Sequence, residues 1–434
     1  MRRPQKTRKL GYHQRASVEH EGYDEVRSTS CGEQRKQDGV ENLFGRILER
    51  NNLNQAYLQV VRNKGAAGAD GMTVDQLLPY LKEHREELLS NLRQGNYKPQ
   101  PVLRVEIPKP NGGVRKTVID RMLQQAINQV LQPLFEPEFS DNSYGFRPNR
   151  SAHDAVKKAK SYYEQGYRYV VDIDMKAYFD TVNHDKLMYF IERKVKDKQV
   201  LKLIRQYLMS GVMENGLITT TEEGTPQGGN LSPNCNIYVR SKRAGQRVMK
   251  KSIQFLEEQL KLTVNREKSA VGSPLKRKFL GFCILPTKKG IKIRPHAKAK
   301  QRVKSKLKQL TKRNRGRSIQ LILKEIKQLM TGWINYYGIG EMKEFMRELN
   351  GWLKRRIRQY IWKQWKNPNP RTKRKNLIRL GIDKAKAYEW SNTRKGIWSI
   401  SKSHILHRSL TDKELARQGY EDISLKYQFV HSTY

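Results

Sequence analysis

The sequence predicts an α+β fold, an antiparallel sheet with helices, followed by an all-α, basic region. Two extended segments support the first part: residues 101–107 alternate in polarity, and Tyr169–Asp174 is an apolar strand that ends on carboxylates. Beyond Pro295, apolar residues recur at helical spacing among many lysines and arginines. We therefore place a domain boundary near residues 290–295.

Helical spacing and turn residues outline the individual elements. Helices are predicted from Leu43, over 75–92, around 123–134, from Ser151, from Asp185, from Asp197 and over 255–262. Strands are predicted over 101–107, 114–116, 169–174, 235–239, 279–282 and 291–293. Two further helices carry the apolar stripes Ile322, Ile326, Leu329, Trp333, Tyr337 and Phe345, Leu349, Trp352, Tyr360. The predicted divisions are a flexible basic leader over 1–40, a first domain over 41–292, a helical region over 293–410 and a tail over 411–434.

The chain is strongly basic. Its 434 residues include 86 lysines and arginines against 42 acidic residues, a formal net charge of +44. Such an excess repels itself unless a polyanion shares the surface, and 21 tyrosines and 6 tryptophans offer rings on which bases stack. We favour nucleic-acid binding over the alternative, a solvated basic surface. No apolar run reaches membrane-spanning length, which argues against a membrane protein.

The cysteines and the start of the chain bear on its compartment. Cys31, Cys235 and Cys283 have no paired spacing, so they predict neither a disulfide framework nor a zinc site. The segment Met1–Lys6 is basic but has no apolar core, so it is not typical of a signal peptide. We therefore expect a cytoplasmic, nucleic-acid-associated protein.

Two motifs point to chemistry on phosphates. Asp172 and Asp174, two positions apart on one strand, lie on the same face of it, and carboxylate oxygens are ligands for Mg²⁺. Taken alone, they are equally typical of solvated acids before a turn. The second motif, Gly224–Pro233, contains the glycine pair Gly228 and Gly229, which lets the backbone approach a nucleotide closely.

Together, Tyr169–Asp180 and Gly224–Pro233 resemble the palm of reverse transcriptases, specifically the bacterial group II intron-encoded kind. The resemblance implies a right-hand polymerase, with fingers and palm followed by a helical thumb and maturase domain. It also implies Mg²⁺ as cofactor, with Asp174 and Asp172 as its ligands and Phe179 beneath the incoming sugar. It further implies binding of deoxynucleotide triphosphates and of an RNA template with a DNA primer or target. The remaining site residues that it implies are Lys109 and Arg115 of the fingers hairpin, Gln227 and Gly228 at the nucleotide, and Lys268 at the leaving pyrophosphate.

The C-terminal region resembles the maturase domain of the same proteins, most clearly in Gly332–Gly338 and Trp352–Arg358. This implies group II intron RNA as a partner, since structured RNA is recognised through shape, phosphates and stacking. Trp333 and Tyr337 lie on an apolar stripe and are expected in the core. The expected RNA-binding residues are Lys312, Arg313, Arg315, Arg317, Arg355, Arg356, Arg371, Lys373 and Arg374.

The chain departs from this family at two places. In the family, a helix, a strand and a turn carrying Tyr-Ala-Asp-Asp follow the Ser-Pro, whereas here Asn234 alone separates Pro233 from the expected second strand. A shorter gap lies between Lys116 and Thr117. We interpret both as internal deletions, and we expect unpaired strand edges in the palm and loss of polymerase activity. The alternatives are a non-catalytic splicing cofactor and a retron-type reverse transcriptase, and the long basic C-terminal region argues against the retron type.

Overall fold

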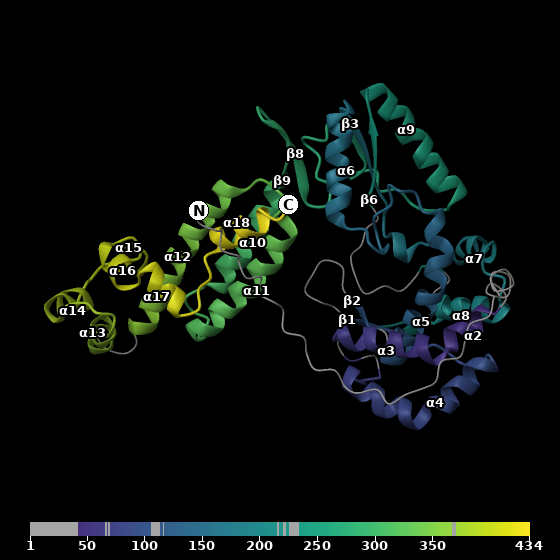
Figure 1. Cartoon of the computed structure of the whole chain (residues 1–434), viewed down its shortest axis with the longest axis horizontal. Helices are drawn as coiled ribbons and strands as arrows, with labels where there is room; N and C mark the ends of the chain where they lie inside the picture. The colour runs from purple at the N-terminus through teal and green to yellow at the C-terminus, as the bar shows by residue number, and fades with distance from the viewer. Residues whose placement is uncertain are drawn as a thin grey trace, which may run out of the picture.

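The computed structural model describes residues 42–65, 67, 70–105, 113–115, 117–214, 217–219, 223–224, 234–366 and 370–434. Along the chain, an N-terminal helical part with a small sheet comes first, a second small sheet follows, and a helical C-terminal region ends the molecule (Figure 1). The fold is therefore mixed and helix-rich, as predicted. None of the described helices is long and apolar enough to cross a membrane.

The N-terminal helices share one apolar core. Each presents a stripe of leucine, isoleucine or valine, and Leu43, Ile47 and Leu77 are fully buried in that core. Side-chain caps fix where the helices begin: Asn42 accepts from the Gly45 amide, and Thr117 accepts from the Asp120 amide. The helices are α2 (Leu43–Leu48), α3 (Arg50–Arg62), α4 (Leu77–Arg93), α5 (Val118–Phe135) and α8 (Lys198–Met209).

A four-stranded sheet accompanies these helices, in the order β2-β1-β4-β5. The predicted hairpin is confirmed as an antiparallel pair, and the sequence did not predict the last two strands. The strands are β1 (Val102–Val105), β2 (Gly113–Arg115), β4 (Val212–Glu214) and β5 (Leu217–Thr219).

The second sheet positions the two aspartates. Its central strand β3 (Tyr169–Asp174) pairs antiparallel with β6 (Asn234–Val239) on one side and with β7 (Ala270–Gly272) on the other. The second strand expected after Pro233 is therefore confirmed. β3 itself is paired on both sides, so any unpaired edge of this sheet lies on β6 or on β7. The three-stranded sheet leaves β6 and β7 as its edges.

Helices cover both faces of this sheet. On one face, Val171 and Ile173 pack with Ile253 of α9 (Lys242–Gln254). On the other, Tyr162 of α6 (Ala152–Glu164) stacks on Tyr238 of β6, with ring centroids 5.3 Å apart. A short helix, α7 (His184–Glu192), precedes α8.

Two predicted elements of this region are wrong. The α-helix does not span 255–262: α9 ends at Gln254, and Phe255–Gln259 continue it as one π turn. The prediction also missed α9, which packs on the sheet at Gly245, where an added Cβ would lie 2.6 Å from the Val271 side chain. The strand predicted over 279–282 begins only at Phe282, since Leu280 and Gly281 have φ angles of 48° and 85° and form a turn.

The hairpin β8 (Phe282–Thr287) and β9 (Gly290–Pro295) joins the sheet to the C-terminal helices. Phe282 and Ile293 pack on Val156 of α6, and Tyr336 and Tyr337 from the C-terminal region pack against the same cluster. The hairpin ends at the predicted boundary near 290–295.

The C-terminal region is all α, as predicted, and has one large core. Trp362, Ile334 and Leu353 are almost completely buried in it, and Trp333 and Tyr337 pack against it as expected. The helices are α10 (Ala297–Leu310), α11 (Ile319–Tyr337), α12 (Lys343–Lys366), α13 (Pro370–Arg379), α14 (Lys384–Ser391), α15 (Ile397–Ile400), α16 (His404–Ser409), α17 (Asp412–Arg417) and α18 (Ile423–His431).

Residues 411–434 do not form a separate tail. Leu415, Ile423 and Tyr427 are buried in the same core as α11 and α12. The Tyr427 hydroxyl accepts from the Met342 amide at 3.1 Å and donates to the Gly340 carbonyl at 3.0 Å. The predicted division at 410 is therefore wrong, because α17 and α18 complete the apolar surface that the longer helices offer.

Tyr427→Phe should destabilise the C-terminal region by about 1–3 kcal/mol, because it leaves a buried amide and a buried carbonyl without their partner. All six tryptophans lie between residues 333 and 398, so denaturant unfolding followed by tryptophan fluorescence reports on this region. Tyr434→Phe, at a residue 55% exposed, is the control. Equal stability of the two variants would contradict the assignment of α18 to the core.

Candidate nucleic-acid groove and carboxylate site

The end of β3 brings Asp174 and Lys268 together. The Lys268 ammonium lies 3.7 Å from Asp174 Oδ2. Backbone contacts fix this arrangement, because the Asp174 amide donates to Ser269 Oγ and the Asn265 amide donates to the Asp174 carbonyl, at 3.0 and 2.8 Å. Asp174 Oδ1 is buried and has no hydrogen-bond partner among the described residues. One carboxylate oxygen is thus available to a cation.

Asp172 is engaged with its neighbours instead. Its Oδ2 lies 3.4 Å from a guanidinium nitrogen of Arg277, and its Oδ1 accepts from the side-chain amide of Asn236 at 3.2 Å. Burial raises the pKa of Asp172 above its usual value, and the charge of Arg277 opposes that shift. Both oxygens of Asp172 therefore have partners within the protein.

The carboxylates do not fit a two-metal centre. Such a centre clasps its ions between carboxylates from more than one strand. Opposite the aspartates, β6 offers Asn234, Cys235 and Asn236, and the sequence 224–233 contains no acidic residue. Within the described residues, no three His, Cys, Asp or Glu side chains are grouped to hold a metal ion.

The structure describes only some of the other residues that were predicted at the nucleotide site. Phe179 lies in a 3₁₀ turn (Tyr178–Asp180), partly exposed, with its ring edge-on to Tyr178 at 4.9 Å. Arg115 ends β2, and its side chain lies outside the described part. Lys109, Gln227 and Gly228 lie outside the described residues, so their roles stay predictions.

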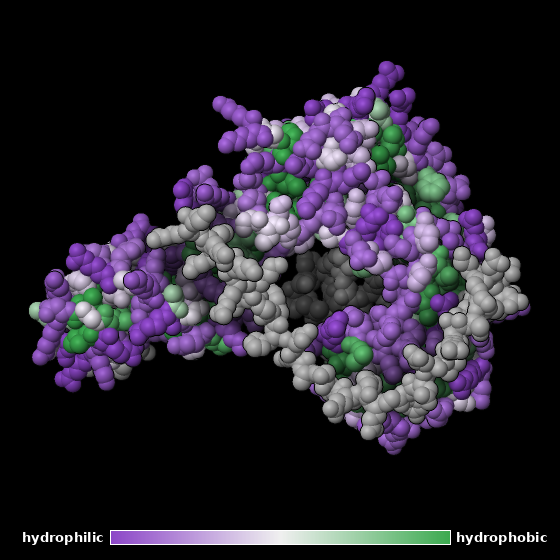
Figure 2. Space-filling model, in the orientation of Figure 1, coloured by the Kyte–Doolittle hydropathy of each residue, from purple (hydrophilic) through white to green (hydrophobic). Residues whose placement is uncertain are grey.

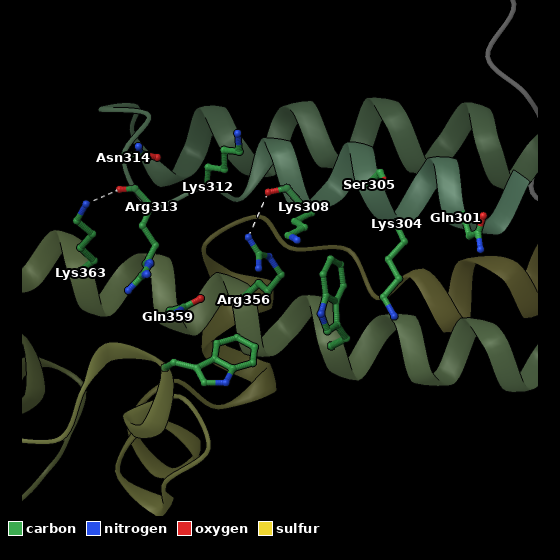
Figure 3. Close-up of a pocket in the computed structure, with 12 residues that line it drawn as sticks. Gln301, Lys304, Ser305, Lys308, Lys312, Arg313, Asn314, Arg356, Gln359 and Lys363 are labelled. Carbon is green, nitrogen blue, oxygen red and sulfur yellow. Dashed lines mark hydrogen bonds between the residues drawn. The ribbon is translucent and has the colours of Figure 1, made fainter. Parts of the chain in front are cut away.

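A basic groove runs between α10 and α12 in the C-terminal region (Figure 3). Its volume is about 1200 Å³, and six of its twelve lining residues are cationic, while none is acidic. Hydrophilic side chains also cover most of the visible face of this region (Figure 2). The residues that line the basic groove are Gln301, Lys304, Ser305, Lys308, Lys312, Arg313, Asn314, Trp352, Arg356, Gln359, Lys363 and Trp398.

Among the described residues, the groove cations have no acidic partners. In the described part of the chain, none of the six forms an ion pair. Arg356 donates instead to the Thr311 hydroxyl at 2.6 Å and to the Lys308 carbonyl at 3.2 Å, and Lys363 donates to the Arg313 carbonyl at 2.9 Å. These contacts orient the side chains and leave their charge uncompensated.

Other cations of the region are neutralised. Arg315 and Arg317 both pair with Glu325, and the hydrogen bond from Arg315 holds the pKa of Glu325 below its usual value. Lys354 and Arg358 pair with Asp412, at 2.8 and 2.9 Å. The structure therefore separates a free set of charges in the groove from a paired set outside it.

Eight of the nine predicted RNA-binding residues fall into three groups. Lys312, Arg313 and Arg356 line the groove, whereas Arg315 and Arg317 face Glu325. Three others lie against aromatic rings: Arg355 on Trp398 at 3.6 Å, Arg374 on Tyr388 at 3.9 Å and the buried Lys373 on Trp362 at 5.0 Å. Arg371 lies in the first turn of α13.

Sequence reasoning missed part of the groove. Lys304 and Lys308 lie four residues apart on α10, a spacing that places them on one helix face. That signal was present in the sequence. Lys363 and Trp398 reach the groove only through the packing of α12 and α15, which no local pattern reveals.

Two protein families match the parts of the chain that hold the carboxylate strand and most of α10 to α12. Residues 107–236 match the family "Reverse transcriptase (RNA-dependent DNA polymerase)", and residues 300–380 match "Group II intron, maturase-specific domain". In these two parts the chain is similar to reverse transcriptases and to the maturases of group II introns.

The chain spans only about a third to a half of the length of the named relatives that it resembles. The chain is 36% identical over 213 residues to the group II intron-encoded protein LtrA of Lactococcus lactis subsp. cremoris, over 47% of this chain and 35% of LtrA. It is 35% identical over 204 residues to protein YkfC of Escherichia coli, over 45% of this chain and 54% of that protein. Among solved structures, a Cas6-RT-Cas1–Cas2 complex aligns at a TM-score of 0.32 and 18% identity, over 61% of this chain and 41% of that chain, which is too distant to support an argument.

Proposed function

We propose that this chain binds the structured RNA of a group II intron through its C-terminal region and assists the splicing of that intron, without synthesising DNA. The observation that carries the proposal is the basic groove, in which six cations have no acidic partner in the described structure. Uncompensated cations along a groove bind phosphates by releasing counterions. In this proposal, residues 41–292 correspond to fingers and palm, and residues 293–434 correspond to thumb and maturase, in a cytoplasmic bacterial protein.

The same proposal assigns the carboxylate site a structural role. Asp172 holds Arg277 and Asn236, and Asp174 holds the segment 265–269 against the sheet. These contacts stabilise the three-stranded sheet through opposite charges and backbone hydrogen bonds.

The second candidate function is RNA-directed DNA polymerisation. One observation favours it: Asp174 Oδ1 has no partner among the described residues, so it offers one oxygen to Mg²⁺. A polymerase would also bind an RNA template, a DNA primer and deoxynucleotide triphosphates near Phe179, Gln227 and Lys268.

A splicing assay tests the proposed function. Intron RNA transcribed from the locus that encodes this chain is incubated with and without the protein, at Mg²⁺ concentrations where the RNA alone splices slowly. We expect the protein to accelerate splicing, because it neutralises phosphates of the folded intron. No acceleration, together with no salt-dependent binding of that RNA, would contradict the proposal.

A further inference from the structure

We propose that the basic groove takes an unpaired, single-stranded segment of RNA and that a base of this segment stacks on Trp398. The inference rests on the proposed RNA-binding function and names the kind of RNA that the groove recognises. It depends on four features of the groove: the exposure of Trp398, the backing of its ring, the charge around Trp352 and the size of the space.

Trp398 is exposed and held in place. Its side chain is 45% exposed although it lines the groove. The Arg355 guanidinium lies 3.6 Å from the centre of its ring, and Arg355 does not line the groove. Arg355 therefore covers one face of the Trp398 ring. The part of the ring that lines the groove is not the part that Arg355 covers.

Backbone contacts fix the segment that carries this ring. The Trp398 carbonyl accepts from Ser401 Oγ at 2.6 Å and from Arg355 at 3.5 Å, and Arg355 also donates to Ser401 Oγ at 3.2 Å. None of these contacts uses the indole ring. A ring positioned this way loses little conformational entropy when a base stacks on it.

Phosphate-binding groups lie beside a second ring. Lys304 and Arg356 lie over the Trp352 ring, at 5.6 and 5.2 Å from its centre. In a single strand, each nucleotide carries an exposed base and a phosphate, so a groove that contains both rings and cations matches its chemistry. The volume of about 1200 Å³ exceeds the roughly 300–1,000 Å³ of small-molecule sites, which favours a chain segment over one small ligand.

A duplex would use this groove differently. In double-stranded RNA the bases are paired and stacked on each other, so proteins contact the sugar hydroxyls and phosphates of the duplex. The groove cations can bind the phosphates of either form, whereas an exposed indole stacks only on a base that is unpaired. Selectivity for single strands should therefore depend on Trp398 and not on the lysines.

The test compares full-length variants in binding to a labelled 12-nucleotide uridine RNA and to a duplex RNA of the same length. Trp398→Ala should lower single-strand affinity about tenfold, within the roughly 1–3 kcal/mol of base stacking, and change duplex affinity less than about twofold. Trp398→Phe should retain most of the single-strand affinity, because it keeps an aromatic ring. The matched control is Tyr388→Ala, which removes a ring that is 45% exposed and backed by Arg374, but that does not line the groove.

Each outcome separates this inference from the proposed function. If Trp398→Ala leaves both affinities unchanged, weakens both equally, or matches Tyr388→Ala, the stacking inference is wrong while RNA binding stands. If the unmodified chain binds neither RNA in a salt-dependent way, the proposed function itself fails. A DNA oligonucleotide of matched sequence tests whether the groove prefers RNA. Circular dichroism of each variant confirms that it is folded.

Discussion

Primer extension by this chain should remain at background when it is supplied with Mg²⁺, a primer annealed to an RNA template and deoxynucleotide triphosphates. Nucleotide addition needs carboxylates that hold two metal ions between strands, and the loss of such a set removes many orders of magnitude in rate. The described structure offers Asp172, already paired with Arg277, and Asp174, with one free oxygen. The strand beside them offers Asn234, Cys235 and Asn236 in place of acids.

The control for this prediction is an active reverse transcriptase in a parallel reaction. Asp174→Ala should leave the background unchanged, because no synthesis depends on it. Robust extension that disappears in Asp174→Ala would overturn the prediction and restore polymerisation as the function. Asn236→Asp sharpens the test: it places a second carboxylate opposite Asp172, so Mg²⁺ should raise the thermal stability of this variant more than that of the unmodified chain.

The carboxylate strand shows which parts of the sheet the sequence could predict. An apolar run ending in Asp172 and Asp174 predicted a buried strand with both acids on one face, and the pairing of β3 with β6 agrees with it. The strand predicted over 235–239 also pairs with β3, as β6. The sequence did not predict β7 on the other side of β3, because its three residues are too few to show an alternating pattern.

The basic groove shows what the sequence could not predict. Arg315 and Arg317 belong to a basic run that resembles an RNA-binding loop, yet Glu325 of α11 neutralises both. Arg313, two residues earlier in the same run, lines the groove without an acidic partner in the described structure. Local composition cannot distinguish these cases, because the partner of a surface charge is set by the packing of α10, α11 and α12.

Replacing Lys304 and Lys308 together by alanine should weaken intron RNA binding about tenfold or more and flatten its salt dependence. Each cation that contacts a phosphate contributes a slope of about −0.7 in log K against log salt for single strands, so the double variant should lose about 1.4 of slope. If all six groove cations contact phosphates, the unmodified chain should have a slope of roughly −4. Both quantities follow from fluorescence anisotropy of labelled RNA at several salt concentrations.

The matched control is Arg315→Ala with Arg317→Ala, which removes the same two positive charges from the same region. These arginines already share Glu325, so their loss should change affinity less than about threefold and leave the slope nearly unchanged. The comparison holds total charge constant and varies only whether the charge is free or paired. If both pairs weaken binding equally, the net charge of the chain rather than the basic groove governs RNA binding, because an ion-paired arginine would then attract phosphate as strongly as a free lysine.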